Sequence, residues 1–320
     1  MPQPPRLSAD HYLAHGLGND YLVFEEVEGS EDPPAPDSWI ATVPAIRLVC
    51  HRWEGLGSDG IVVLGRGHGG QPFPLRMFNP DGSEFERSGN GLRILASYLR
   101  RTDRVGGEPF TVRSGGSEIG MRVHGVSASG THDVSVEMGR ARTDPAAVDL
   151  DADLLQGSGL PHPSRGRIEF QPVSVGNPHA VVFLGDHSDE TLAEVGSFLS
   201  THAAFRRGTN VQLARVVGPG VLRIAIWERG VGRTSASGTS SCAAAVAAVH
   251  RGYLAPGRIR VTMAGGELQV GVSADLDVTL RGPVQEVMTG RLTPGFVAGL
   301  GRLTEERRAS GPSGTDAGEE

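Results

Sequence analysis

The chain has 320 residues, of which 38% are hydrophobic and 21% are charged, and its formal net charge is −7. These values are typical of a globular protein with one large or two ordinary domains, and the acidic balance argues against a nucleic-acid or anionic-membrane partner. The first ten residues carry no signal-peptide pattern, and no run of about 18 apolar residues could span a bilayer. The two cysteines, Cys50 and Cys242, cannot form a disulfide framework. We therefore expect a cytoplasmic protein.

The first half of the chain alternates short strand patterns with a single helix pattern. Apolar segments bounded by Gly, Pro, Asn and Asp predict strands at 21–24, 61–64 and 75–78. An apolar run that favours a helix then extends from Leu92 to Leu99. Three further strands are predicted after this helix, at 109–113, 121–123 and 133–138.

The second half repeats this order. Strands are predicted at 168–170, 172–175, 180–183, 211–214 and 222–227, a helix follows Gly238, and two more strands are predicted at 259–262 and 268–272. Because each half places several strands around one apolar helix, the sequence predicts a duplicated α+β architecture. We place an N-terminal domain at residues 1–140 and a C-terminal domain at 141–281. The charged, small-residue-rich segment 304–320 predicts a disordered tail.

Two short segments open the two predicted helices in the same way. Ser88-Gly89-Asn90-Gly91 precedes one apolar run, and Ser237-Gly238-Thr239 precedes the other. A helix start carries unpaired N–H groups and a partial positive charge, so it attracts a carboxylate. Two such starts facing one another would hold one anionic substrate between two serines, an arrangement suited to chemistry at one carbon from two faces. Each serine is also a good helix N-cap, a role compatible with substrate contact.

Other candidate residues have an ordinary structural interpretation beside the functional one. Asparagines are common in turns, the adjacent Glu228 and Arg229 would usually form a solvated pair, and a single histidine such as His179 is more often structural than catalytic. The histidines show no metal-ligand spacing, and no glycine-rich nucleotide-binding loop is present. The sequence therefore predicts neither a metal nor another cofactor.

Eight short motifs nevertheless point to one family. They follow the family's order over roughly residues 11–292, and they are Gly16–Tyr21, Gly55–Gly60, Phe78–Glu84, Ser88–Gly91, Gly176–His179, Gly208–Val211, Glu228–Gly232 and Ser237–Thr239. With them the chain resembles diaminopimelate epimerase and its relatives among the cofactor-independent amino-acid racemases. The resemblance implies two pseudo-symmetric domains, each a mixed, barrel-like sheet around a central helix, with the active site between them. It also implies that the segment 282–303 returns to the N-terminal domain, that the protein is a homodimer, and that it needs no cofactor.

The resemblance also implies a set of substrate-binding residues. They are Asn19, Asn79, Asn177, Asn210, Glu228 and Arg229, together with backbone N–H groups near Gly89, Asn90, Gly238 and Thr239. These residue types suit the zwitterionic end of an amino acid. A guanidinium or a helix start binds its carboxylate, and a carboxylate or amide oxygen binds its ammonium group.

The chain departs from the family pattern at the two reacting positions. The family moves the α-proton between two cysteine thiols, and those positions align with Ser88 and Ser237. A thiol has a pKa of about 8.5 and an alcohol about 16, so forming the anion costs about 10 kcal/mol more with serine. The serines therefore need a base from another group. The resemblance favours His179 as that base, and the other candidate bases are Glu84, Asp81 and Glu228. It also implies that Cys242 is a buried packing residue.

Three functional hypotheses follow from this pattern. The first is a cofactor-independent isomerase that transfers the α-proton of a small-molecule amino acid such as diaminopimelate, in lysine biosynthesis or a related pathway. In it, Ser88 and Ser237 flank the reacting carbon as hydrogen-bond donors or relays, and His179 or Glu228 acts as the catalytic base. The second is a lyase or cyclase on the same fold. The third is a non-catalytic amino-acid-binding protein that kept the pocket without the thiols, whether naturally or because both cysteines were replaced.

Overall fold

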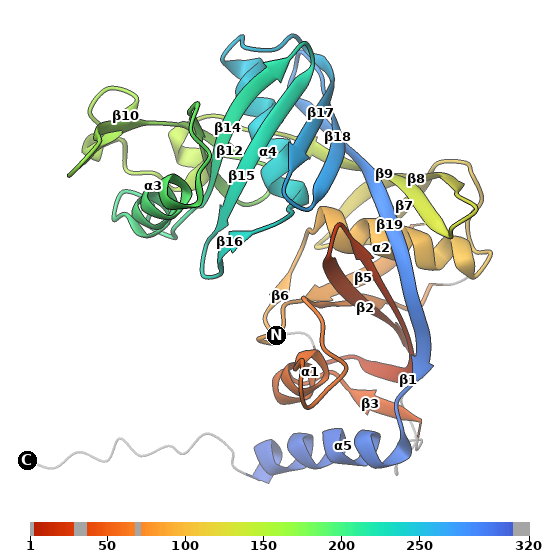
Figure 1. Cartoon of the computed structure of the whole chain (residues 1–320). Helices are drawn as coiled ribbons and strands as arrows, with labels where there is room; N and C mark the ends of the chain where they lie inside the picture. Colours follow the sequence, from red (N-terminus) through yellow and green to blue (C-terminus); the bar gives the residue numbers. More distant parts are fainter. Residues whose placement is uncertain (1–2, 29–36, 68–71, 310–320) are drawn as a thin grey trace, which may run out of the picture.

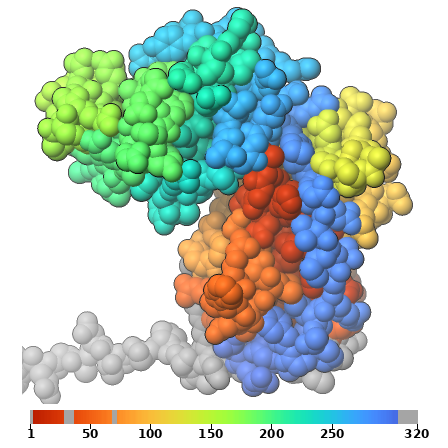
Figure 2. Space-filling model, viewed as in Figure 1, coloured from red at the N-terminus to blue at the C-terminus, as the bar shows by residue number. Residues whose placement is uncertain are grey.

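The computed structural model describes residues 3–28, 37–67 and 72–309 and shows an α+β protein of two lobes (Figure 1). The first half of the chain and its last described residues build the lower lobe in this view, and the part between them builds the upper lobe. The space-filling view shows the upper lobe set at an angle on the lower one, with a notch on the left where they meet (Figure 2). In the described ranges, no helix is long and apolar enough to cross a membrane. The predicted fold class is confirmed.

A closed ring of eight strands surrounds one helix in the lower lobe, as far as the described residues show. In pairing order the ring consists of β1 (Arg6–Gly16), β2 (Asn19–Glu26), β4 (Ile61–Leu64), β5 (Phe73–Phe78), β7 (Phe110–Ser114), β8 (Ser117–Val126), β9 (Thr131–Arg140) and β19 (Asp277–Arg291). β19 pairs with β1 and so closes the ring. The pairs β2–β4 and β5–β7 are parallel, and the others are antiparallel. The remaining elements are β3 (Ser38–Ile40), α1 (Val43–Cys50), β6 (Glu84–Phe85) and the central helix α2 (Gly89–Arg101).

The upper lobe repeats this pattern strand by strand. Its sheet runs through β12 (Gln171–Ser174), β13 (Pro178–Phe183), β14 (Asn210–Gly218), β15 (Val221–Glu228), β17 (Gly257–Met263), β18 (Gly266–Val272) and β19. The second and fourth of these pairings are again the parallel ones. The helices and the short strand also repeat, as α3 (Asp189–Thr201), β16 (Gly232–Thr234) and α4 (Gly238–His250). A separate hairpin of β10 (Gly159–His162) and β11 (Gly166–Glu169) lies outside the repeat.

The long strand β19 joins the two lobes (Figure 1). Its first residues pair with β18, and it pairs with β9 from Asp277 onward and with β1 up to Arg291. Its return to the N-terminal lobe therefore begins before the predicted residue 282. The next helix, α5 (Pro294–Ala309), packs on α1 through Val297 and Leu300. Residues 304–309 are thus helical where the sequence predicted a disordered tail, and 310–320 lie outside the described residues.

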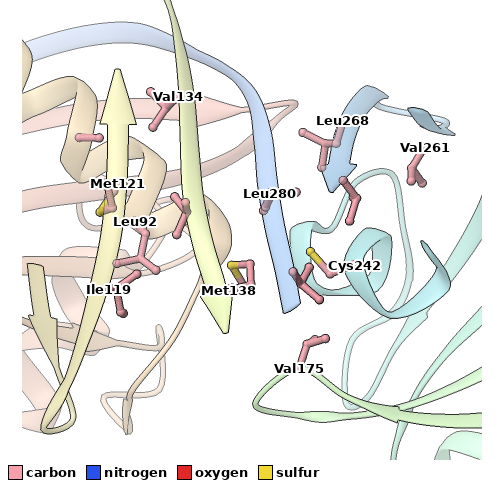
Figure 3. Close-up of a cluster of buried hydrophobic side chains, with 14 of the residues drawn as sticks. Leu92, Ile119, Met121, Val134, Met138, Val175, Cys242, Val261, Leu268 and Leu280 are labelled. Carbon is pink, nitrogen blue, oxygen red and sulfur yellow. The ribbon is translucent and has the colours of Figure 1, made fainter. Parts of the chain in front are cut away.

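The two central helices form the core of the molecule. Ten of the thirteen residues of α2 and nine of the thirteen of α4 are buried, as expected for helices that are enclosed by a sheet on all sides. Between the two helices, Leu280 of β19 lies among Leu92, Met138, Val175 and Cys242 (Figure 3). The predicted burial of Cys242 is confirmed. This shared core fixes the position of one helix start relative to the other.

Candidate active site

The N-termini of α2 and α4 face one another. A Cβ added to Gly238 would lie 3.8 Å from the Cα of Gly89. Leu280 packs beside both, since its Cδ2 would lie 2.5 Å from a Cβ on Gly89 and 2.9 Å from one on Gly238. The two distances to Leu280 are shorter than real side chains allow in a close-packed interior. Glycine at the first position of each helix therefore allows the two helix starts to approach.

Ser88 and Ser237 cap these two helices. The N–H of Gly91 donates to Ser88 Oγ over 3.0 Å, and the N–H of Ser240 donates to Ser237 Oγ over 3.5 Å. Both serines have the extended backbone that an N-cap adopts. A capping hydroxyl uses an oxygen lone pair, so its hydrogen remains available to donate. The capping role thus leaves both serines able to act on a ligand.

The first turns of α2 and α4 leave their positive ends uncompensated. Neither turn contains an acidic residue, whereas the surface helix α3 has Asp189 and Glu190 in its first turn. An acidic first turn would neutralise part of the helix dipole. The two facing ends therefore direct their N–H groups and positive potential into one space, which suits a carboxylate.

A cavity of about 870 Å³ opens at these helix starts and is lined by both lobes. Its volume suits a small-molecule ligand. The predicted residues that line it are Asn19, Asn79, Ser88, Gly89, Asn90, Asn177, Glu228, Arg229, Ser237, Gly238 and Thr239. Tyr21, Asp59, Glu86 and Arg87 also line it, although the sequence did not assign them to the site. The predicted residues His179 and Asn210 and the candidate bases Glu84 and Asp81 lie outside its lining.

His179 is completely buried beneath the cavity wall. Its Nε2 lies 2.8 Å from Asn177 Oδ1, and Gln212 Nε2 lies 3.0 Å from its Nδ1. Burial lowers the pKa of His179 to about 3, although the hydrogen bond with Gln212 opposes this shift, so the ring is neutral at pH 7. Both ring nitrogens are engaged, and neither reaches the cavity. The role of base predicted for His179 does not fit this position.

The same contacts make His179 a support for Asn177. With Nδ1 accepting from Gln212, the ring proton lies on Nε2 and is donated to Asn177 Oδ1. The Asn177 amide nitrogen is then the end left for the cavity. Gln212 is itself fixed, because its amide also donates to Ser240 Oγ in the first turn of α4 over 3.0 Å. The sequence motif located His179 near the site. It could not show that the buried Gln212 binds its ring and holds it away from the cavity.

Glu228 is a carboxyl group beside a cap serine. It ends β15, is half-buried, and lines the cavity with Ser237. Burial raises its pKa, and the negative charge of Asp59 raises it further, whereas a hydrogen bond with Ser237 opposes the rise. A carboxylate with a raised pKa is a stronger base than an exposed one. The geometry therefore favours Glu228 among the predicted bases.

The other two carboxyl candidates are engaged outside the cavity. Glu84 forms an ion pair with Arg76 at 2.7 Å, and Asp81 accepts hydrogen bonds from the N–H and hydroxyl of Ser83 at 2.8 and 2.6 Å. Neither residue lines the cavity. Their proximity in sequence to Ser88 does not bring them to the site.

Tyr21 is the counterpart of Glu228 beside Ser88. It lies in β2, is buried, and lines the cavity. Burial raises its pKa to about 12, the charges of Asp59 and Glu228 act in the same direction, and a hydrogen bond with Ser88 opposes them. A neutral phenol thus accompanies Ser88, where a half-buried carboxyl accompanies Ser237. Tyr21 ends one of the family-like motifs, but its alternating surroundings predicted only a strand residue.

A chain of hydrogen bonds holds the N-terminal wall of the cavity. Asn19 Nδ2 donates to Asp59 Oδ2 at 2.8 Å, and Asn90 Nδ2 donates to Asn19 Oδ1 at 2.8 Å. Arg93, which is buried, donates to Asn90 Oδ1 at 2.9 Å, and burial lowers its pKa to about 10. Most of the hydrogen-bonding capacity of Asn19 and Asn90 is therefore used within the protein, where it fixes the start of α2.

The remaining two asparagines hold turns. Asn79 Nδ2 donates to Ser83 Oγ at 2.9 Å, on the edge of the cavity. Asn210 Oδ1 accepts from the backbone N–H of Arg229 at 3.0 Å, and its amide donates to the carbonyl of Pro178 at 3.1 Å. Asn210 thus positions the Arg229 turn from behind the cavity wall.

Neither cysteine reaches the cavity. Cys50 and Cys242 are buried, and burial raises their pKa values to about 11 and about 12, respectively. Within residues 3–28, 37–67 and 72–309, no group of three or more His, Cys, Asp or Glu side chains could hold a metal ion. The chemistry available in the cavity is thus that of hydroxyl, carboxyl, amide and guanidinium groups.

Comparison with known proteins identifies the family. The family model described as diaminopimelate epimerase matches residues 11–143 and 172–292. Diaminopimelate epimerase 2 of Nostoc sp. is 35% identical over 285 residues, which is 88% of this chain and 95% of that protein. The diaminopimelate epimerase of Desulforudis audaxviator is 36% identical over 280 residues, covering 87% of this chain and 96% of that protein.

The chain belongs to the diaminopimelate epimerase family. Solved structures agree with this family at the level of the fold. A predicted epimerase from Pseudomonas aeruginosa matches with a TM-score of 0.61 and 19% identity over 88% of this chain and 98% of that one. A hydroxyproline epimerase from Agrobacterium vitis, solved with trans-4-hydroxy-L-proline, matches with a TM-score of 0.62 and 17% identity over 90% and 92%.

This member of the diaminopimelate epimerase family has serine at both helix starts. Ser88 and Ser237 stand where the resemblance predicted the reacting thiols. The family membership predicted from the eight motifs is confirmed. Proton transfer between the two faces of a substrate would therefore need side chains other than cysteine.

Proposed function

We propose that this protein is a cofactor-independent isomerase that transfers the α-proton of an amino acid of the diaminopimelate type. One observation carries the proposal. Two helix starts, capped by Ser88 and Ser237, face one another across a cavity that also holds the half-buried carboxyl of Glu228. Membership of the diaminopimelate epimerase family supports the substrate class.

The facing helix starts bind the substrate carboxylate. The backbone N–H groups of Gly89, Asn90, Gly238 and Thr239 are the donors nearest the junction of the two helices. When the α-proton leaves, the electron pair of the C–H bond spreads into this carboxylate. Fixed N–H groups stabilise the added negative charge without reorganising.

Glu228 takes the α-proton on the Ser237 side. Its carboxylate oxygen forms the new O–H bond as the C–H bond breaks. The raised pKa brings this carboxyl closer to neutral pH, which makes it a better base while it remains ionised. Ser237 hydrogen-bonds to Glu228 and holds the carboxylate toward the reacting carbon.

Ser88 and Tyr21 return a proton on the opposite side. The Ser88 hydroxyl gives its proton to the α-carbon, and the Tyr21 hydroxyl replaces that proton and becomes a phenolate. Water then returns a proton to Tyr21 and removes one from Glu228. Because burial holds the pKa of Tyr21 at about 12, the phenol is a weaker acid than the protonated Glu228, so the intermediate regains a proton from Glu228 more often than from the Ser88 side. We therefore expect exchange of the α-hydrogen with solvent to be faster than inversion.

Proton NMR in D2O tests this proposal. The protein is incubated with LL- and meso-diaminopimelate beside a Ser88→Cys, Ser237→Cys double variant. Loss of the α-proton signal with the unchanged protein is the expected result. Exchange by the double variant alone would contradict serine-based catalysis and favour an amino-acid-binding protein. No loss of the α-proton signal with either protein would overturn the substrate class. A change in the carbon skeleton of the ligand would favour a lyase or cyclase.

Three further features belong to the proposal through the family resemblance. They are a homodimer, a cytoplasmic location and a place in lysine biosynthesis. Light scattering on the purified protein tests the dimer. Growth of a bacterial strain that lacks its own diaminopimelate epimerase, after introduction of this chain, tests the place in metabolism, and failure to grow with the protein expressed would contradict it.

A further inference from the structure

Arg93 is a charged side chain in the core, one turn inside α2. Only 1% of the residue is exposed, and burial lowers its pKa to about 10, so the guanidinium is still charged at pH 7. In the part of the chain that the structure describes, Arg93 forms no ion pair. Asp133, an acid whose charge acts on it, is held in a two-point ion pair by Arg281. A buried cation without an acidic partner is costly, so this position calls for a specific reason.

Three neutral oxygens accept hydrogen bonds from this guanidinium. They are the carbonyl of Gly89 at 3.2 Å, the carbonyl of Pro283 at 3.0 Å and Asn90 Oδ1 at 2.9 Å. Because Pro283 lies in β19, the guanidinium joins the first turn of α2 to the strand that connects the two lobes. These bonds satisfy three of its five N–H donors and leave its positive charge unbalanced.

Two glycines leave space for the guanidinium. A Cβ on Gly16 would lie 2.9 Å from Arg93 Nη2, and a Cβ on Gly282 would lie 2.5 Å from Arg93 Nη1. Gly16 ends β1 and Gly282 lies in β19, so both strands lack a side chain where they pass the guanidinium. Larger residues at either position would displace the cation from the start of α2.

The bond to the Gly89 carbonyl acts on a peptide group at the cavity wall. The Gly89 carbonyl and the N–H of Asn90 belong to one planar trans peptide, so they point in opposite directions. The N–H of Asn90 is an unpaired donor of the first turn of α2, and Asn90 lines the cavity. A charged donor at the carbonyl polarises the peptide and strengthens its N–H as a donor. The same bond fixes the direction of that N–H.

The upper lobe has no cation at the matching position. Arg93 is the fifth residue of α2, and Cys242 is the fifth residue of α4. Burial raises the pKa of Cys242 to about 12, so its thiol is neutral at pH 7. Thr239, the second residue of α4, matches Asn90 and has no such cation one turn further along its helix. The buried charge therefore reinforces one of the two facing helix starts.

We propose that Arg93 is a positioning residue for the reacting carboxylate of the substrate and acts through the N–H of Asn90. The guanidinium orients and polarises the Gly89–Asn90 peptide, and the bound carboxylate supplies the anion that balances its charge. The carboxylate therefore bonds more strongly to the start of α2 than to the start of α4. This inference rests on the proposed binding of an amino acid at the helix starts and names a buried residue that strengthens it.

Isothermal titration calorimetry with a diacid and its diamide tests this role. Diaminopimelate has two carboxylates, and in its diamide both are replaced by neutral amides. Arg93→Met is expected to weaken the diacid by about tenfold and the diamide by less than about twofold. Arg93→Lys keeps the charge and should recover part of the affinity for the diacid. Arg100→Met removes a charge from the last turn of the same helix and should change neither affinity.

Amide NMR of the unchanged protein gives a test that needs no variant. On addition of diaminopimelate, the N–H resonance of Asn90 is expected to move downfield further than that of Thr239, its counterpart in α4. Equal shifts, or a larger shift of Thr239, would overturn the role of Arg93. Equal weakening of the diacid and the diamide by Arg93→Met would also overturn it, because a purely structural residue affects both ligands alike.

These outcomes separate the role of Arg93 from the proposed reaction. Selective weakening of the diacid together with an unchanged α-proton signal in D2O would retain Arg93 as a positioning residue and contradict the isomerase. Exchange of the α-proton together with equal weakening of both ligands would retain the isomerase and contradict the role of Arg93. No measurable binding of diaminopimelate to the unchanged protein would overturn both.

Discussion

The cavity has two faces that share one backbone and differ in their side chains. On each face an extended serine caps a helix, a glycine begins the helix, and the first turn has no acidic residue. Beside Ser237 lies a carboxyl whose pKa is raised by burial. Beside Ser88 lie the buried phenol of Tyr21 and the half-buried guanidinium of Arg87. The anion-binding backbone is duplicated, and the proton-transfer groups are not.

This difference means that duplication of a fold need not duplicate its chemistry. In the proposed reaction the backbone N–H groups of both lobes act on the substrate carboxylate, because they follow from the helix geometry alone. A base requires a specific side chain, and among the described residues the carboxyl that hydrogen-bonds to a cap serine is Glu228, beside Ser237. We therefore expect proton removal and proton return to have different rates, and each prediction below tests that asymmetry.

The largest effect is expected for Glu228→Gln. The variant keeps the size of the side chain and removes its ability to accept a proton, so exchange of the α-hydrogen should slow by about a hundredfold or more. NMR in D2O measures the rate. The unchanged protein should also lose exchange as pH falls, with a midpoint above the ordinary range of a glutamate, because the carboxylate must be ionised to act and its pKa is raised. A neutral His179 contributes nothing to this profile.

Glu84→Gln is the matched control for this variant. Glu84 pairs with Arg76 outside the cavity, so its neutralisation should leave the exchange rate and the pH midpoint unchanged. Equal losses in both variants would indicate a general effect of charge and would contradict the assignment of Glu228 as the base.

Ser88→Cys should convert the face without a base into one that has a base. A thiol has a pKa of about 8.5, so a useful fraction is thiolate at neutral pH. Inversion of diaminopimelate should then rise by about tenfold or more and approach the rate of exchange. Chiral chromatography measures inversion, and NMR measures exchange. Ser237→Cys should change the ratio of inversion to exchange far less, because Glu228 already serves as the base on that face. A larger effect of Ser237→Cys than of Ser88→Cys would reverse the assignment of the two faces.

Gly89→Ala tests the close approach that the two faces share. Its Cβ would lie 2.5 Å from Leu280 Cδ2, so the core must shift, and the free energy of unfolding should fall by about 1–3 kcal/mol. Gly238→Ala, with 2.9 Å to the same atom, should lose less. Urea unfolding measures both. Combining Gly89→Ala with Leu280→Ala should cost less than the sum of the single variants, and strict additivity would show that the two positions do not interact.

The features that could be predicted from the sequence depend on residues that lie close together in the chain. Serine and glycine before an apolar run predicted both helix starts, and the motif order indicated the family and the fold. Cys242 could be predicted to be buried because it lies inside the apolar run of α4. Local signals of this kind need no knowledge of which elements meet.

The features that could not be predicted depend on contacts between distant segments. His179 is turned away from the cavity by Gln212, which is 33 residues further along the chain. Tyr21 reaches Ser88 because β2 lies against α2 in the closed ring, and an alternating strand pattern does not say which inward residue meets a helix start. The resemblance favours His179 as the base, and its burial, which the sequence does not state, makes that role unsuitable.

Tyr21→Phe is expected to have the smallest effect and to test the Ser88 face most directly. Phenylalanine keeps the packing of a buried ring and removes the hydroxyl that contacts Ser88. Water can replace Tyr21 as the group that returns a proton to Ser88, so the variant loses one hydrogen bond of about 1 kcal/mol, and inversion should slow by about fivefold. Exchange should stay constant, because Glu228 on the other face removes the proton. The ratio of inversion to exchange, measured on one sample by chiral chromatography and NMR, therefore falls if Tyr21 supplies the returning proton. An equal fall in both rates would mean that the tyrosine acts only by holding the cavity wall, and the asymmetry between the faces would then rest on Glu228 alone.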